Sequence, residues 1–373
     1  MEKSREKLQY NMNEIEKGFL VERKLSREDI IERYEWIKTK RSKVNSINED
    51  RNYLTRKVYF PDTFNGLYCA RYSSDGETVV TGYGSGCIQL RNGDTGELRN
   101  SLKAALETSF PVTSCCFHPI NRNIIYASSA CGSIFLCKMN TVEFYNFSTE
   151  LDNEINAVDV NISGEYVITG GKDAGLRVYD SETGKLIKNY TKDKINLIAE
   201  DATKFHHMRI FAVKCHRIDS NIVVTGGWDA IVKVWDLRVG GGSIKAINGP
   251  YICGNAIDLR DTNILTGSWV VKNSLQIWDI SSGKLIETVN PINRETTLDG
   301  EYLYVAQYFD GDPYGEHVVV GGSGIGFVEV INLKEKNVVA RFKVNKAVLT
   351  IDSYKTNIVY GGMDSTINLT EYF

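Results

Sequence analysis

The sequence lacks features that would place it in several large classes of protein. No uninterrupted apolar run approaches the roughly 20 residues that span a bilayer, and residues 1–10 are charged without an apolar core, so neither a membrane span nor a cleaved secretory signal is expected. The 44 basic and 47 acidic residues leave a formal net charge of -3, which offers no electrostatic footprint for nucleic acid or an anionic membrane surface. We therefore expect neither as a partner.

Residues suited to catalysis or metal binding are also scarce. The eight cysteines include no CxxC pair and no histidine at metal-ligand spacing, so we interpret them as small core residues in a reducing compartment. None of the five histidines stands in a recognisable nucleophile motif, and we interpret them as surface or turn residues. We predict no catalytic residue, no cofactor, no metal and no small-molecule substrate.

What the sequence does contain is one pattern that recurs seven times. Each copy has an apolar alternating run, a turn, a run that ends in Thr-Gly or a near equivalent, a second turn, and a run of the form x-Ile-x-Val-Trp/Tyr-Asp. The marked glycines are on average roughly 46 residues apart, the period expected for four short strands per propeller blade. Alternation at period two is typical of strands packed between neighbouring sheets. The sequence therefore predicts an all-β fold, a single seven-bladed β-propeller of four-stranded antiparallel blades.

From about residue 56 to the end, these copies resemble the WD-repeat (transducin beta-like) family. The terminal dipeptide of that family is recognisable at Tyr179-Asp180, Trp235-Asp236 and Trp278-Asp279. The loop acid that accompanies it in the family is present as Asp173, Asp229 and Asp364. The Gly-His pair that normally precedes the inner strand and bonds to this acid is missing, so the resemblance implies an incomplete polar tetrad between blades.

The seventh copy stops at its third strand, over residues 367–373, so another segment has to supply its outermost strand. The β-prone run 56–60 lies immediately before the first inner strand and is the obvious donor. We predict that Val58, Tyr59 and Phe60 pair with the C-terminal strand and close the ring, which leaves no open edge at the seam.

Residues 1–52 differ in kind from the repeats, and we assign them to a charged helical N-terminal arm that precedes a propeller over residues 53–373. The arm carries charges of both signs and no proline over residues 1–50. Ile30, Tyr34 and Ile37 fall on one face of a helix. Packing of this face on the propeller, docking onto another protein and disorder of the arm remain alternatives.

The loops between second and third strands are the most informative for function, because in the family they lie on a face that commonly receives partners. Exposed tryptophans are uncommon, and interfaces concentrate their binding energy in Trp, Tyr and Arg. Local packing of the indoles is the alternative interpretation. With Phe205 from the insertion 191–209, the candidate partner-binding residues are Tyr83, Lys172, Phe205, Trp228, Trp269 and Met363.

Together these features favour a non-catalytic scaffold or adaptor that presents a loop face to other proteins, within a multi-subunit complex in the cytoplasm. The alternative is a structural component of a cytoskeletal or ciliary/axonemal assembly, tethered through the N-terminal arm. A propeller hydrolase or lyase is disfavoured because the sequence offers no convergent acid, base and nucleophile.

Overall fold

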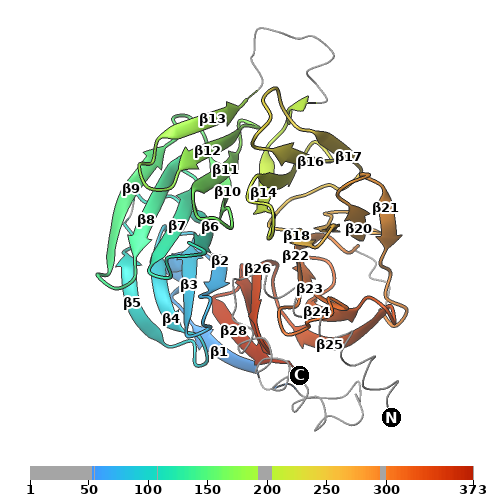
Figure 1. Cartoon of the computed structure of the whole chain (residues 1–373). Helices are drawn as coiled ribbons and strands as arrows, with labels where there is room; N and C mark the ends of the chain where they lie inside the picture. Colours follow the sequence, from blue (N-terminus) through green and yellow to red (C-terminus); the bar gives the residue numbers. More distant parts are fainter. Residues whose placement is uncertain (1–52, 54, 107, 192–203, 295–299, 373) are drawn as a thin grey trace, which may run out of the picture.

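The computed structural model describes residues 53, 55–106, 108–191, 204–294 and 300–372. Within these residues, seven four-stranded antiparallel sheets stand around one axis like the blades of a propeller (Figure 1). In each blade the first strand lies nearest the axis, and in six blades the chain then runs outward strand by strand. The prediction of an all-β, seven-bladed propeller is confirmed.

The strand bounds of the seven blades follow the chain. Blades one to three contain β2 (Leu67–Tyr72), β3 (Thr78–Tyr83), β4 (Ile88–Asn92), β5 (Leu98–Lys103), β6 (Val112–Phe117), β7 (Ile124–Ser129), β8 (Ser133–Lys138), β9 (Glu143–Thr149), β10 (Ile155–Val160), β11 (Tyr166–Gly171), β12 (Leu176–Asp180) and β13 (Leu186–Tyr190). Blades four to six contain β14 (Ile210–Cys215), β15 (Ile222–Gly227), β16 (Ile231–Asp236), β17 (Lys245–Asn248), β18 (Ile257–Arg260), β19 (Asn263–Gly267), β20 (Leu275–Asp279), β21 (Leu285–Thr288), β22 (Leu303–Tyr308), β23 (His317–Gly322), β24 (Phe327–Asn332) and β25 (Asn337–Lys343). Blade seven combines β26 (Val348–Tyr354), β27 (Asn357–Gly362) and β28 (Thr366–Glu371) with β1 (Thr55–Tyr59), and a short 3-10 helix, η1 (Asp62–Phe64), follows β1.

The apolar core lies between neighbouring blades. Val224 and Val232 of blade four, for example, share one buried cluster with Ile257 and Ile264 of blade five. Because each sheet is covered on both sides, its second strand is buried almost throughout, and every residue of β3 and β23 is buried. The period-two apolar runs therefore supply the contacts that join one blade to the next.

A glycine at or next to the last position of six second strands lies close to the next blade. A Cβ atom on Gly226 would lie 2.7 Å from Ile257 of the next blade, and one on Gly361 would lie 2.7 Å from Leu67. Blade two has Ser128 at this position. The same close approach, at 3.0 Å or less, holds at Gly82, Gly170, Gly267 and Gly321. The recurring Thr-Gly pattern is thus a packing requirement, because a larger residue would push the blades apart.

Aspartates near the axis add polar links between inner strands. Asp159 Oδ2 accepts a hydrogen bond from the Cys215 amide at 2.8 Å, which ties blade three to blade four. Asp352 Oδ2 accepts one from the Tyr72 amide at 2.7 Å, which ties blade seven to blade one. Asp258 links blades five and six in the same way, through the amide at position 308. These carboxylates accept hydrogen bonds from backbone amides that the strand pairing within each sheet does not use.

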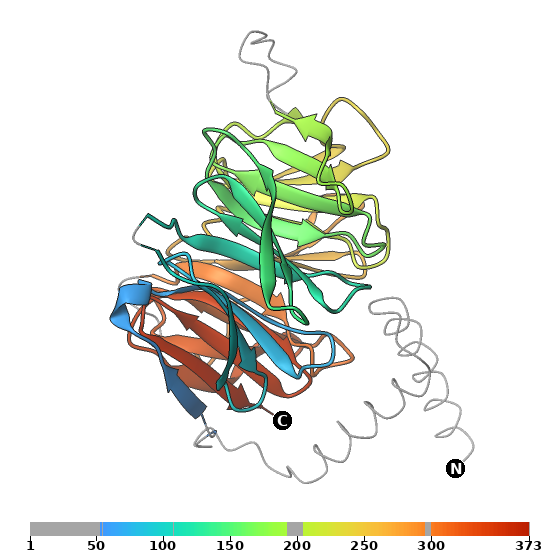
Figure 2. The ribbon, with the colours of Figure 1, turned by 90° about the vertical axis from the view of Figure 1, so that its left-hand side faces the viewer.

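Strand β1 closes the ring as the sequence predicted. It pairs antiparallel with β28, with Val58 opposite Ile367 and Tyr59 opposite Thr366, and in Figure 2 it lies in blue beside the red C-terminal strands. Phe60 is buried and packs its ring 5.0 Å from that of Tyr83 in blade one. The closing strand therefore joins blade seven to blade one through both backbone pairing and apolar contact.

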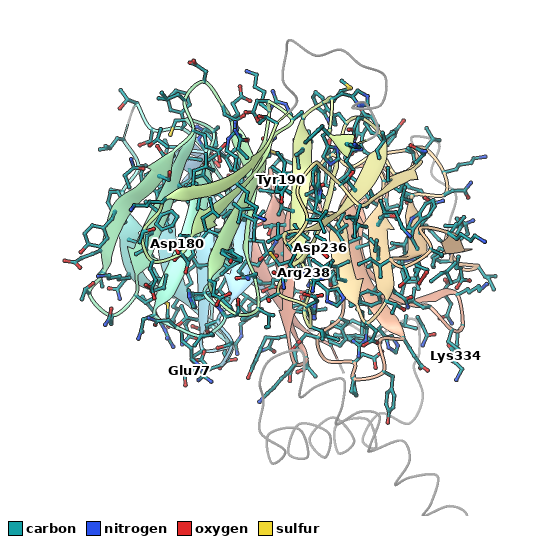
Figure 3. The ribbon with its side chains drawn as sticks, turned by 45° about the horizontal axis from the view of Figure 1, so that its top comes forward. Glu77, Asp180, Tyr190, Asp236, Arg238 and Lys334 are labelled. Carbon is teal, nitrogen blue, oxygen red and sulfur yellow. The ribbon has the colours of Figure 1, made fainter. Side chains whose placement is uncertain are left out.

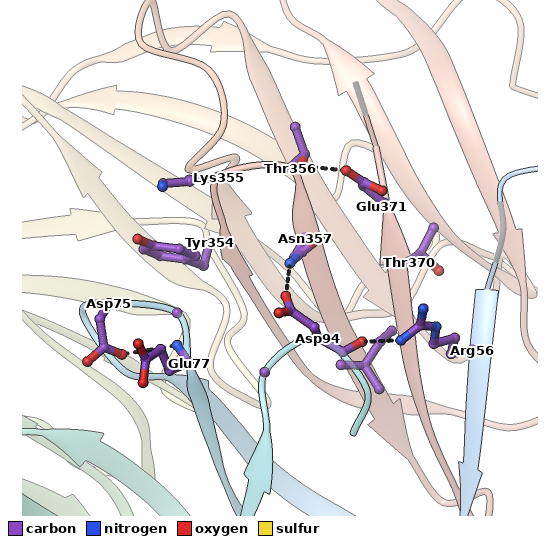
Figure 4. A pocket seen from close by; sticks show the side chains of 13 residues that line it. Arg56, Asp75, Glu77, Asp94, Tyr354, Lys355, Thr356, Asn357, Thr370 and Glu371 are labelled. Carbon is purple, nitrogen blue, oxygen red and sulfur yellow. Dashed lines mark hydrogen bonds between the residues drawn. The ribbon is translucent and has the colours of Figure 1, made fainter. Parts of the chain in front are cut away.

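Polar contacts reinforce this seam (Figure 4). Arg56 donates from Nη1 to the carbonyl of Asp94 at 3.1 Å, and Asn357 donates from Nδ2 to the Asp94 carboxylate at 3.1 Å. Both bonds cross from blade seven to the turn between β4 and β5. They border a shallow cavity of about 440 Å³.

The predicted N-terminal arm, residues 1–52 with Ile30, Tyr34 and Ile37, lies outside the described residues. The helical character of the arm and the placement of these three residues on one face of a helix remain predictions.

The closure makes a direct prediction about two adjacent residues. Phe60→Ala should destabilise the propeller by about 3–5 kcal/mol, because it leaves a cavity between blades seven and one. Tyr59→Ala should change stability by less than about 0.5 kcal/mol, because the Tyr59 side chain is 75% exposed. Urea unfolding of both variants checks this, and equal effects would contradict a closing role for Phe60.

Candidate protein-interaction site

The loops between second and third strands share one face of the disc with the connections that lead into each new inner strand. We call this the loop face, and it includes Lys172, Trp228, Trp269 and Met363. The opposite face, formed by the turns between first and second strands, is called the turn face. Every inner strand begins at the loop face and ends at the turn face, so different residues of the repeat lie on the two faces.

Bulges in the inner strands direct side chains onto the loop face. In six blades the register between first and second strands shifts after the first residue of the inner strand, which leaves one extra residue there. Such an extra residue is unpaired and its side chain is re-aimed. These half-buried residues are Tyr68, Thr113, Asn156, Phe211, Tyr304 and Leu349.

Trp228 follows β15 and leaves 38% of its surface exposed. Its ring centroid lies 5.1 Å from that of the bulged Phe211, and the Arg209 guanidinium lies 5.5 Å from the indole. The indole nitrogen donates a hydrogen bond to Cys253 Sγ at 3.1 Å. The indole is thus held in place from three sides while one side remains open to solvent.

Trp269 occupies the corresponding position after β19 and is 37% exposed. Its ring lies 4.8 Å from Tyr302 and 6.4 Å from the bulged Tyr304. The segment that holds Cys253 also carries Tyr251, whose carbonyl accepts the Trp269 amide at 2.8 Å. The two tryptophans therefore stand on either side of the segment 251–254 and form, with their neighbours, an aromatic surface across blades four to six.

The other candidate residues divide into exposed and packed positions. Lys172 is on the loop face and pairs with Glu154 at 2.6 Å, and Met363 is exposed on the loop after β27. Phe205 is half-buried, with its ring 6.5 Å from that of Trp235. The structure therefore brings Trp228 and Trp269 together, and leaves Lys172 and Met363 on other blades of the same face.

The expectation that Tyr83 offers its side chain to a partner is wrong. Tyr83 is the last residue of β3 and has no exposed surface. Its hydroxyl accepts a hydrogen bond from Arg91 Nε at 3.1 Å and donates one to Gln89 Oε1 at 3.1 Å. The side chain turns inward because these two polar groups of β4 and the rings of Phe60 and Phe64 surround it.

The expectation that the polar tetrad lacks its histidine is also wrong for blade four. His206 Nδ1 lies 2.7 Å from Asp229, and its Nε2 lies 2.7 Å from Thr225 Oγ1. Trp235 donates from Nε1 to the same hydroxyl at 2.8 Å. One consistent assignment is a neutral imidazole that donates to Asp229 and accepts from Thr225, which in turn accepts from Trp235. His206 comes from the long insertion before β14, where no Gly-His dipeptide marks it.

Two of the five histidines, His206 and His317, are buried. This contradicts the expectation that all five are surface or turn residues. His206 is 1% exposed, and His317 Nδ1 bonds Asp312 at 2.6 Å inside blade six. His118 and His216 do lie in turns, where each Nδ1 accepts two backbone amides. All four serve the fold, because their ring nitrogens are engaged with backbone or core groups.

The tetrad is not complete in blades three and five, which also carry the aromatic dipeptide. Trp278 donates to Thr266 Oγ1 at 3.0 Å in blade five, where no histidine joins the pair within the described residues. In blade three, Asp173 instead forms an ion pair with Arg177. The acids of the dipeptides accept hydrogen bonds in the turns that follow. Arg238, labelled with Asp236 in Figure 3, donates from its guanidinium to the Asp236 carboxylate at 2.7 Å.

The described residues offer neither a metal site nor a helical membrane span. Within the described ranges, no three His, Cys, Asp or Glu side chains are grouped so that they could hold a metal ion. The part of the chain that the structure describes contains no helix with the length and apolar character needed to cross a membrane.

The buried histidine predicts a pH dependence of stability. Burial lowers the pKa of His206 below its unfolded value of about 6.5, so below that pH the unfolded chain binds a proton that the folded chain does not. Its contribution to stability is therefore present above about pH 6.5 and is lost as the pH falls. His206→Gln should lower stability at pH 7 by about 1–3 kcal/mol and flatten the fall below pH 6.5.

Urea unfolding at a series of pH values measures both effects, with His207→Gln as the control because its side chain is half exposed. If the free energy of unfolding fell as steeply below pH 6.5 in His206→Gln as in the unmodified chain, the neutral, buried state of His206 would be contradicted.

Comparison with known proteins agrees with the architecture. Residues 144–180 and 202–236 match the WD40 family, described as WD domain, G-beta repeat. A WD repeat-containing protein 55 homolog of Drosophila persimilis is 29% identical over 137 residues, which cover 34% of this chain and 23% of that protein. Autophagy-related protein 16 of Arabidopsis thaliana is 26% identical over 33% of this chain and 30% of that protein. Rik1-associated factor 1 of Schizosaccharomyces pombe is 27% identical over 47% of this chain and 28% of that protein.

These matches span about a quarter to a third of the length of the relatives named. Proteins of this family are typically non-catalytic and generally act as protein-interaction scaffolds. Seven four-stranded blades, the Asp-His-Thr-Trp network of blade four and the two matched repeats are features that this chain shares with WD40-repeat β-propellers.

Proposed function

We propose that this chain is a non-catalytic scaffold that holds partner proteins on the aromatic part of its loop face. The observation that carries the proposal is the pair of half-exposed tryptophans, Trp228 and Trp269, each supported by a bulged aromatic residue of an inner strand. Interfaces concentrate their binding energy in such rigid, amphipathic side chains. A partner would bury the open sides of both indoles at little cost in side-chain entropy, because their positions are already held.

Membership of a multi-subunit complex is part of this proposal. The Schizosaccharomyces pombe relative is named for its association with Rik1, and the family's general role is interaction. The cytoplasm is the proposed location, supported by eight free cysteines, most of them buried in the core. The alternative role in a cytoskeletal or ciliary assembly depends on the N-terminal arm, which lies outside the described residues.

The proposal predicts that the loop-face tryptophans dominate partner capture. Trp228→Ala combined with Trp269→Ala should weaken binding by at least about 2 kcal/mol, or roughly 30-fold, because both anchors are lost. Affinity purification of the full chain with quantitative mass spectrometry identifies the partners, and titration with the purified partner gives the affinity.

Leu98→Ala is the matched control, because Leu98 is an exposed apolar residue on the outer strand β5. It should recover the same partners as the unmodified chain. Equal recovery by the tryptophan variant, at unchanged thermal stability, would reject the loop face as the binding site. Loss of partners only on removal of residues 1–50 would favour the tether alternative.

A further inference from the structure

The end of the propeller axis on the turn face carries a cavity that the loop-face function does not use. Its volume is about 280 Å³, near the lower end of ligand pockets. All seven blades contribute to its lining, because all seven inner strands converge there. We call it the channel mouth, and its lining includes Phe117, Ile120, Asp159, Ile162, Lys214 and Asp352.

The charges of the channel mouth are unevenly distributed. Its two cations both serve Asp258: Arg217 bonds both carboxylate oxygens at 2.9 and 3.0 Å, and Lys214 lies 3.2 Å from one of them. Although burial opposes it, the charges of Arg217 and Lys214 hold the pKa of Asp258 well below its usual range. Asp258 is therefore a compensated anion, and the two cations are already engaged.

Asp159 is in a different situation. It is half-buried at the channel mouth and accepts hydrogen bonds from the amides of Val160 and Cys215. Among the described residues no Lys, Arg or His nitrogen lies within ion-pair distance of its carboxylate. Burial raises the pKa of Asp159, and this shift is only opposed by the more distant charge of Lys214, by the two amide hydrogen bonds and by the charge of Arg71. An added cation in direct contact would complete this partial compensation.

Apolar side chains border the cavity on the same side as Asp159. Ile120 and Ile162 lie in the turns between first and second strands of blades two and three, and Ile218 lies in the equivalent turn of blade four. Ile120 is 54% exposed and Ile218 is 48% exposed. His118 and His216 brace two of these turns, because each ring also contacts a turn carbonyl of the next blade. Ile120 and Ile162 are thus apolar parts of the cavity lining, and Ile218 follows the lining residue Arg217 in the chain.

We propose that the channel mouth receives an arginine side chain from a partner protein, with apolar residues of that partner resting on Ile120 and Ile218. The small volume fits one side chain, and charge complementarity selects a cation beside Asp159. Guanidinium is more weakly hydrated than ammonium and offers several donors in one plane. The site lies on the opposite face from Trp228 and Trp269, so it gives the scaffold a second, independent point of attachment.

The test uses N-acetyl-arginine amide as the probe and N-acetyl-citrulline amide as its uncharged counterpart. Titration of the full chain, followed by amide NMR shifts, should place the arginine probe at residues of the turn-face turns in blades two to four. The citrulline probe should bind at least about tenfold more weakly, because it cannot compensate a carboxylate.

Two variants localise the effect. Asp159→Asn removes the charge with little change in shape and should weaken arginine binding at least about tenfold. Ile120→Lys places a cation on the exposed rim, where folding is not at risk, and should also suppress binding. Glu77→Gln is the matched control, an exposed carboxylate at the seam cavity, and should leave affinity unchanged.

Several outcomes would overturn the proposal: equal affinity for both probes, unchanged affinity in Asp159→Asn and Ile120→Lys, shifts confined to the seam cavity, or no saturable shift. The variant with both loop-face tryptophans replaced by alanine should bind the arginine probe as the unmodified chain does. Failure of the loop-face proposal and failure of this one are therefore distinguishable.

Discussion

Close contact between neighbouring blades is the constraint on which the rest of this structure depends. No blade can bury both of its faces alone, so each needs its neighbours on either side. One close contact lies near the end of the second strand, where Gly226 meets Ile257 and where Gly361 meets Leu67 across the seam. Because the last contact depends on a blade completed by β1, the closing strand matters for the whole ring.

Polar groups between the blades follow from the same constraint. Once apolar strands are pressed together, any polar atom between them must find a partner. Asp159, Asp258 and Asp352 meet this need near the axis by accepting amides of the next blade. His206 meets it nearer the loop face of blade four, where it joins Asp229 to the Thr225 and Trp235 pair. Different residues therefore supply these interior hydrogen bonds in different blades, while the backbone geometry repeats.

A rigid ring allows its two faces to specialise. The loop face gathers aromatic side chains because bulges in the inner strands aim Phe211 and Tyr304 beside two half-exposed tryptophans. The turn face gathers charge near the axis, because inner strands end there with acidic residues such as Asp159. The two faces therefore offer different shapes and charges to any partner.

Repetition in the sequence was enough to determine the number of blades, the strand order within them and the closing role of β1, because period-two alternation and turn residues act locally. It also placed Trp228 and Trp269 on one face. The tertiary structure decided the rest. Tyr83 turned inward because Arg91 and Gln89 surround it, and His206 reached Asp229 from an insertion without a motif. These partners lie on different strands or loops, so their contacts depend on tertiary packing and not on a local sequence pattern.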